Sequence, residues 1–190
     1  MTTTQNSSPL AVQLASGTYT LDPTHSRIGF VARHAMVTKV RGSFNEFTAT
    51  AEVDSDDITR SSAQVAIKVD SIDTRNEQRD GHLRSNDFLD IATYPEITFA
   101  TTSVTPTGDD VVRVEGDLTI KSVSRPVTID FTFEGAAVDP YGNQRVGFEG
   151  SVVISRKDWG ITWNAALETG GVLVSDKITL EFEVSAIKAA

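Results

Sequence analysis

The fold is decided by segments such as Pro126-Val127-Thr128-Ile129-Asp130-Phe131-Thr132-Phe133-Glu134. After the proline, apolar and polar residues alternate without interruption. A period of two is typical of a β-strand that has one buried face and one exposed face, because successive side chains point to opposite sides of the sheet. We therefore expect a strand here, with its valine, isoleucine and phenylalanines facing a core.

The same alternation recurs along most of the chain and predicts about eight strands. The expected inward positions are Ile28, Phe30, Ala32 and His34; Val40, Gly42 and Phe44, then Phe47, Ala49, Ala51 and Val53; Ala63, Val65, Ile67 and Val69; Ile97 and Phe99; Val112, Val114, Leu118 and Ile120; Val127, Ile129, Phe131 and Phe133; Val146, Phe148, Val152 and Ile154; and Ile178, Leu180, Phe182 and Val184. In the second strand the inward parity changes between Phe44 and Phe47, so we expect a bulge near Asn45-Glu46.

The turns between these strands indicate how they pair. Most are short and rich in Asp, Gly and Pro, so neighbouring strands should be antiparallel. Either a sandwich or a closed barrel satisfies this pattern. The length of the strands favours an all-β, eight-stranded, antiparallel, lipocalin-like barrel, because closure removes exposed edges. A barrel of this size encloses either packed side chains or one small ligand. The amino-acid composition is compatible with both a packed interior and a ligand cavity.

Residues 74–89 interrupt the alternation between the third and fourth strands. Thr74 and Glu77 have the spacing of a helix capping box. Leu83, Phe88 and Leu89 supply apolar side chains that a solvated loop would not carry. The segment is predicted to be a short helix and turn that plugs or braces one end of the β structure.

Composition narrows the class of protein. The 190 residues fit one domain at 17–190, preceded by a disordered tail at 1–16, and the net charge of −9 argues against nucleic acid and against docking on an anionic membrane. With no cysteine there is no disulfide or thiolate site. No segment approaches the length of a membrane-spanning helix, so no stable membrane insertion is expected. The N-terminus lacks the features of a signal peptide, so we expect a cytoplasmic location.

The candidate polar chemistry is sparse. His25, His34 and His82 could form a zinc site, but their spacing matches no helical pair and the chain has no His-Glu-x-x-His motif. Ordinary hydrogen-bonded histidines are therefore the simpler interpretation, and no metal is expected. His34 lies at the end of an inward face. There it could be a satisfied core histidine, could bind a ligand's polar head, or could act as the base of an isomerase or hydrolase with Asp22 or Asp80. Trp159 and Trp163 are predicted either to form an aromatic lip on a pocket or to cap the core.

Several ordered motifs resemble one family. They are Asp22-x-x-His25-Ser26, Phe30 with His34, Gly42-x-Phe44, Arg79-Asp80-x-His82-Leu83, Asp87-Phe88, Tyr94-Pro95, Gly116-x-Leu118-Thr119-Ile120, Arg125-Pro126-Val127, and Arg156 with Gly160. Together they resemble the YceI-like polyisoprenoid-binding proteins over about residues 17–187. The chain departs from the family pattern at Tyr19, Ser122 and Leu89.

The resemblance implies a long apolar channel that accommodates an isoprenoid quinone, a polyprenyl compound or a similar amphiphilic lipid. It also implies a homodimer, and it supplies no catalytic residues. Many members are secreted or periplasmic, so the absence of a signal peptide points to a cytoplasmic branch. We therefore expect a lipid-binding protein that sequesters or transports its ligand and requires no cofactor. The residues expected to line the channel are Ile28, Phe30, His34, Phe44, Val65, Ile67, Leu83, Phe88, Phe99, Leu118, Ile129, Phe131, Phe148, Ile154, Trp159, Trp163, Leu180 and Phe182. A barrel with a filled interior and a purely structural role is the remaining alternative.

Overall fold

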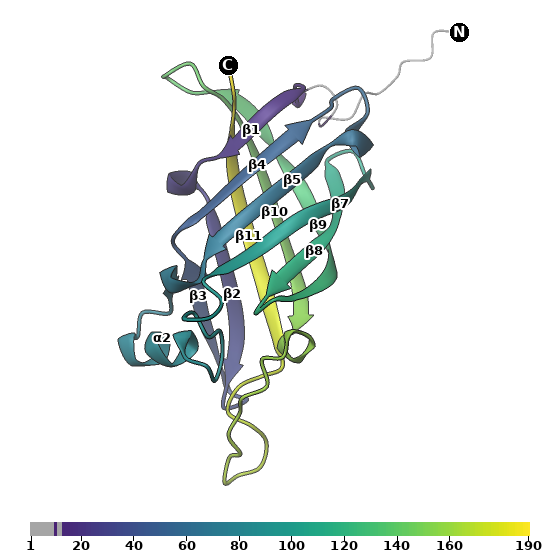
Figure 1. The fold of residues 1–190 in the computed structure, drawn as a ribbon. Helices are drawn as coiled ribbons and strands as arrows, with labels where there is room; N and C mark the ends of the chain where they lie inside the picture. The colour runs from purple at the N-terminus through teal and green to yellow at the C-terminus, as the bar shows by residue number, and fades with distance from the viewer. Residues whose placement is uncertain (1–9, 11–12) are drawn as a thin grey trace, which may run out of the picture.

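The computed structural model describes residue 10 and residues 13–190, which form a closed antiparallel barrel (Figure 1). Its strands are β1 (Gly17–Leu21), β2 (Arg27–His34), β3 (Thr38–Phe44), β4 (Phe47–Val53), β5 (Ser62–Lys68), β6 (Ile72–Asp73), β7 (Glu96–Pro106), β8 (Val111–Ile120), β9 (Val123–Val138), β10 (Gln144–Ser155) and β11 (Lys177–Lys188). The other elements are helix α2 (Glu77–Arg84) and the 3-10 turns η1 (Pro23–His25), η2 (Ile58–Arg60), η3 (Val69–Ser71) and η4 (Arg156–Trp159).

These eleven segments make the eight barrel strands that the alternation predicts. Three barrel strands are split in two, β1 with β2, β3 with β4, and β5 with β6, whereas β7 to β11 are continuous. The sheet closes because β11 pairs with both β1 and β2. The prediction of a closed eight-stranded barrel is confirmed, and the sandwich is excluded.

In the second barrel strand, the bulge expected near Asn45-Glu46 takes the form of a break in the strand between β3 and β4. Ile28 pairs with Phe44 across β2 and β3, and Phe47 pairs with Ile67 across β4 and β5. The two residues at the break form hydrogen bonds with the end of β5 and the segment between β5 and β6. Asn45 donates its backbone N–H to the carbonyl of Ser71, and the carbonyl of Glu46 accepts from the backbone N–H of Lys68. The break rotates the strand by one residue, so that apolar side chains face inward on both sides of it.

Helix α2 lies between β6 and β7, at the end of the barrel opposite the two chain termini (Figure 1). Its N-cap is Asn76, whose side chain accepts from the backbone N–H of Arg79 at 2.9 Å. The predicted capping box on Thr74 is therefore wrong. Thr74 instead donates its backbone N–H to the buried carboxylate of Asp80 at 2.9 Å, which ties the entry of the helix to its interior.

The predicted disordered tail at 1–16 falls largely outside the described residues. The structure describes this segment only at residues 10 and 13–16. Leu10 and Leu14 are buried and pack with Tyr19 in the smaller of two hydrophobic clusters. This cluster lies toward the end of the barrel that holds the termini, and the larger one lies toward the end beside α2.

No helix among residues 10 and 13–190 has the length and apolar character needed to cross a membrane.

A polar tie on the outside of the barrel joins two elements that are far apart in sequence. Arg145 donates from Nη1 to Asp22 and from Nε to Asp139, both at 2.7 Å. Arg145, and secondly His25, hold the pKa of the Asp22 carboxyl well below its usual range. Asn143, followed by Arg145, does the same for the pKa of Asp139.

Acid is expected to loosen this tie. A carboxylate whose pKa is lowered by folding contributes stability that is complete above its unfolded pKa, about 3.9, and is lost as the pH falls towards the folded pKa. The urea midpoint of the protein should therefore drop steeply below about pH 4. In the Arg145→Met variant the midpoint should be lower at pH 6 and should fall less between pH 5 and pH 2.5. Parallel pH profiles for the two proteins would contradict this assignment.

Candidate functional site

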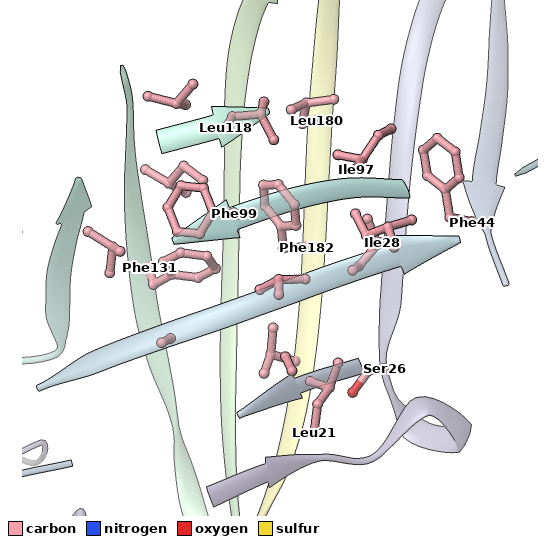
Figure 2. Close-up of a pocket in the computed structure, with 18 of the residues that line it drawn as sticks. Leu21, Ser26, Ile28, Phe44, Ile97, Phe99, Leu118, Phe131, Leu180 and Phe182 are labelled. Carbon is pink, nitrogen blue, oxygen red and sulfur yellow. The ribbon is translucent and has the colours of Figure 1, made fainter. Parts of the chain in front are cut away.

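The interior of the barrel holds an elongated cavity of about 390 Å³. Figure 2 shows part of its wall, with Ile28, Phe99 and Phe182 among the side chains that project into the space between the strands. The volume lies within the usual range of ligand pockets, roughly 300–1,000 Å³. The side chains therefore do not meet in the middle of the barrel. This excludes the alternative, compatible with the sequence, of an interior filled by packed side chains.

Two hydroxyl groups on the wall, those of Ser26 and Thr101, are hydrogen-bonded to the barrel's own backbone. Ser26 Oγ accepts from the backbone N–H of Ser185 at 2.9 Å and donates to its carbonyl at 3.2 Å. Thr101 Oγ1 likewise accepts from the N–H of Ala63 at 3.1 Å and donates to its carbonyl at 3.0 Å. Because these hydroxyl groups are satisfied, the cavity presents a wall that is almost wholly hydrocarbon.

Glycines in the wall explain why the cavity stays open although so many phenylalanines face it. Phe30 pairs with Gly42 across β2 and β3, and its Cζ lies 2.3 Å from the position that a Cβ on Gly42 would take. Phe99 covers Gly116 in the same manner, with its Cζ at 2.4 Å. A ring that covers a glycine lies flat along the wall instead of crossing the lumen, as in aromatic rescue of glycine in a sheet.

Adding a methyl group at Gly42 is expected to narrow the cavity at little cost in stability. The three nearest atoms to a Cβ at Gly42 all belong to the ring of Phe30, which can swing into the empty lumen. Gly42→Ala should therefore weaken uptake of a long apolar ligand about tenfold and shift the unfolding free energy by less than about 1 kcal/mol. Lipid titration and urea unfolding measure the two effects.

The matched variant Gly116→Ala should behave differently. A Cβ there would also lie 2.6 Å from the backbone oxygen of Ala100, which cannot move aside. This variant is expected to lose stability, by about 1–3 kcal/mol. Equal stability losses in the two variants would show that the ring of Phe30 is not free to move.

Most residues predicted from the sequence do line the cavity. The fifteen are Ile28, Phe30, Phe44, Val65, Ile67, Leu83, Phe88, Phe99, Leu118, Ile129, Phe131, Phe148, Ile154, Leu180 and Phe182. They come from all eight barrel strands, together with α2 and the segment after it. The period-two pattern therefore locates the wall as well as the strands.

Three predicted residues lie elsewhere. His34 is exposed, because β2 continues beyond the closed part of the barrel and pairs there with Thr38 in β3. Trp159 is buried in the core and donates its Nε1–H to the carbonyl of Leu118 at 2.9 Å, so it caps the barrel and forms no lip. Trp163 packs edge-on against His82, with ring centres 4.6 Å apart. The expectation that all three line the channel is therefore wrong.

The wall also contains residues that no strand pattern pointed to. Leu14 comes from the N-terminal segment, Ile58 from η2, and Ile161 and Val174 from the long loop between η4 and β11. These residues stand in turns and irregular segments, where no periodicity marks a buried face. Only their apolar character in otherwise polar loops was available as a signal.

A buried arginine holds the loop that closes the α2 end of the barrel. Arg156 donates from Nε to the carbonyl of Ser175 and from Nη1 to those of Ile161 and Trp163, all at 2.9 Å, and its Nη2 reaches the carbonyl of Val174 at 3.4 Å. Burial lowers the pKa of this guanidinium from its usual value. Because backbone carbonyls take up its donors, Arg156 organises the loop and is not free to bind a ligand's head group.

An aromatic cluster lies beside the same end. His82 Nε2 and Asp87 Oδ2 are 2.8 Å apart, and the imidazole ring meets Phe88 edge-on at 5.0 Å. Phe88 in turn lies 5.3 Å from Trp163. The cluster joins α2 to the loop held by Arg156, and its phenylalanine also faces the cavity.

Among the described residues, no three or more His, Asp or Glu side chains gather in a way that could hold a metal ion.

Comparisons with known proteins agree with this architecture. The family model described as a YceI-like domain matches residues 19–186. A UPF0312 protein of Staphylococcus aureus is 41% identical over 169 residues, which cover 88% of this chain and 95% of that protein.

Solved structures show the same fold. BcnA of Burkholderia cenocepacia superimposes with a TM-score of 0.77 at 25% identity, covering 87% of this chain and 98% of that one. A YceI protein of Campylobacter jejuni gives a TM-score of 0.72 at 28% identity over 83% and 90% of the two chains. A polyisoprenoid binding domain from Saccharophagus degradans gives 0.69 at 17% identity over 90% and 98%, which speaks for the fold alone. The family match, the 41% identity and the shared barrel lead to one conclusion: this chain belongs to the YceI-like family.

Proposed function

We propose that this protein binds one long, apolar lipid of the isoprenoid class inside its barrel. The observation that carries the proposal is the elongated cavity of about 390 Å³, whose wall has almost no free polar group. Each methylene group that leaves water for such a wall contributes about 0.8 kcal/mol. A polyprenyl chain or the tail of an isoprenoid quinone would therefore bind through its length, with little need for polar contacts.

The proposed ligand class is the one named for the fold neighbour from Saccharophagus degradans, which is described as a polyisoprenoid binding domain. The shape of the cavity favours a chain over a compact ligand, because its wall extends from Leu14 near the termini to Val174 near α2. We infer that the protein sequesters or transports this lipid.

Binding is favoured over catalysis by the position of His34. The enzyme hypothesis requires this imidazole to reach a substrate in the lumen, but His34 is exposed beyond the closed part of the barrel. His82 pairs with Asp87 outside the lumen wall. We therefore propose a binding protein without a catalytic residue. Turnover of prenyl or acyl substrates that His34→Gln abolishes would contradict this.

The homodimer and the cytoplasmic location stay predictions from the resemblance and from the N-terminal sequence. Sedimentation velocity of the purified protein tests the first, and fractionation of its own host tests the second.

Native mass spectrometry of protein purified from its own host, without detergent, tests the ligand. We expect a mass shift that disappears on organic extraction and an extracted compound that contains repeated isoprene units. Extracted protein should recover the shift when incubated with a polyprenyl alcohol or an isoprenoid quinone. Repeated preparations without lipid, together with no gain in thermal stability on adding these compounds, would refute the proposal.

A further inference from the structure

Two segments meet at the end of the barrel opposite the termini. The turn between β2 and β3 lies against the loop between η4 and β11, since His34 forms a β-bridge with Val174 and Ala35 donates its backbone N–H to Leu173 at 2.7 Å. Figure 1 shows that both segments project beyond the closed wall. We call residues 35–37 and 171–173 the tip.

The tip exposes large apolar side chains. Met36 is 58% exposed, Val37 75% and Val172 38%, which makes three of the six large exposed hydrophobic residues in the described part of the chain. Met36 and Gly171 are close neighbours, since a Cβ on Gly171 would lie 3.4 Å from Met36 Cγ. Contiguous exposed apolar side chains are typical of surfaces that contact another protein or a membrane.

The backbone conformation of the β2–β3 turn does not explain why apolar residues occupy it. Ala35 and Met36 have φ of 50° and 63°, in the left-handed region that favours Gly and Asn. The β8–β9 turn at the same end has nearly the same geometry, with φ of 50° and 62°, and carries the polar Lys121 and Ser122. An alanine and a methionine in left-handed conformation cost stability, so apolar side chains at the tip need another explanation.

The strands next to the tip carry unpaired positive charge. Arg33 lies directly opposite Lys39 across β2 and β3, and Arg41 follows two residues later. All three are exposed, and within the described part of the chain none has a carboxylate within 4.0 Å. Like charges directly opposite each other destabilise a sheet. An anionic partner would remove this repulsion.

The acidic turns lie at the opposite end of the barrel, whereas the loop that carries residues 171–173 holds one exposed acid near them, Glu168. The turns at the opposite end hold Asp54, Asp56 and Asp57, and Asp109 with Asp110. The net charge of −9, on which the expectation against docking on an anionic membrane rests, averages over this separation. An anionic surface attracts one end of the barrel and repels the other, which fixes the orientation of approach.

We propose that the tip docks the protein on the surface of a bilayer that contains acidic phospholipids. Arg33, Lys39 and Arg41 contact the head groups, while the side chains of Met36 and Val37 enter the boundary of the acyl region. This is how interfacial segments bind membranes without spanning them. The inference does not depend on what the cavity holds.

Vesicle flotation at low ionic strength tests the docking. Each cation near an anionic surface contributes about fivefold in partitioning, so three should favour phosphatidylglycerol/phosphatidylcholine vesicles over pure phosphatidylcholine by roughly 100-fold. Lys39→Glu with Arg41→Glu should abolish this preference. Met36→Asn with Val37→Ser should reduce binding about tenfold and leave folding intact, because Asn accepts a left-handed φ.

The matched control changes exposed apolar residues at the other end. Val138, 69% exposed, and Tyr141, 89% exposed, flank Asp139 in the β9–β10 turn. Val138→Ser with Tyr141→Ser should leave flotation unchanged.

Three results would overturn the proposal. They are equal partitioning to both kinds of vesicle, flotation that the tip variants do not change, and a tip variant that instead abolishes self-association in sedimentation velocity. The last would make the tip an interface between copies of this chain. Ala49→Phe, which narrows the cavity, should dock normally, so failure of ligand binding and failure of docking are distinguishable.

Discussion

Replacing Ala49 with phenylalanine is expected to abolish lipid uptake while the barrel stays folded. Ala49 lies on the inward face of β4 opposite Val65, and its small side chain leaves the lumen open. A ring at this position would occupy space needed by about four methylene groups of a bound chain. At about 0.8 kcal/mol each this amounts to roughly 3 kcal/mol, or a loss in affinity of more than 100-fold. Titration of extracted protein with a polyprenyl alcohol, read by native mass spectrometry, measures the effect.

Thr48→Phe is the control for this variant. Thr48 is the neighbouring residue on the same strand, but it is exposed on the outer face. The same ring added there should leave affinity unchanged. If Ala49→Phe binds the lipid as tightly as Thr48→Phe, the ligand does not occupy the cavity, and the proposed function fails even if lipid copurifies with the protein.

Replacing Arg156 with methionine is expected to lower the free energy of unfolding by about 3–5 kcal/mol. The substitution keeps most of the apolar stem, but it leaves the carbonyls of Ile161, Trp163 and Ser175 without their charged donor. Hydrogen bonds to charged groups contribute about 1.5–3 kcal/mol each and are not additive. Since whole domains are stable by about 5–15 kcal/mol, urea unfolding should detect a large shift of the midpoint.

Two further variants separate the role of the guanidinium from that of charge. Arg156→Lys should recover little of the loss, because an ammonium group cannot reproduce the planar fork that reaches several carbonyls at once. Lys157→Met, at the exposed neighbouring position, should shift stability by less than about 0.5 kcal/mol. A loss below about 1 kcal/mol for Arg156→Met would mean that water satisfies the loop carbonyls equally well.

Much of the fold and of the cavity wall could be predicted because both depend on one local rule. In a strand the side-chain period is two, so Ile129, which is buried, and Phe131, which is partly buried, both face the lumen. The parity change between Phe44 and Phe47 could be interpreted in the same way, and the structure places the break there.

The errors arise where this rule stops. The alternation places His34 on the inner face of its strand. It does not reveal that β2 extends beyond the closed part of the barrel, where this face is exposed. Trp159 lies in a 3-10 turn, where a period of two has no meaning. The role of Arg156 depends on carbonyls five to nineteen residues away that only the folded loop brings together. The tip was missed because net charge averages over the two ends of the molecule.

The three split strands are neighbours, and this has a mechanical consequence. Their breaks fall side by side, since Phe44 pairs with both Ile28 and Ile72 on one side of the gap and Phe47 pairs with Ile67 on the other. On this flank short ladders replace the long ones of β7 to β11, so fewer hydrogen bonds resist bending. The barrel is therefore least restrained along these neighbouring breaks, and we expect local opening of the wall to begin there.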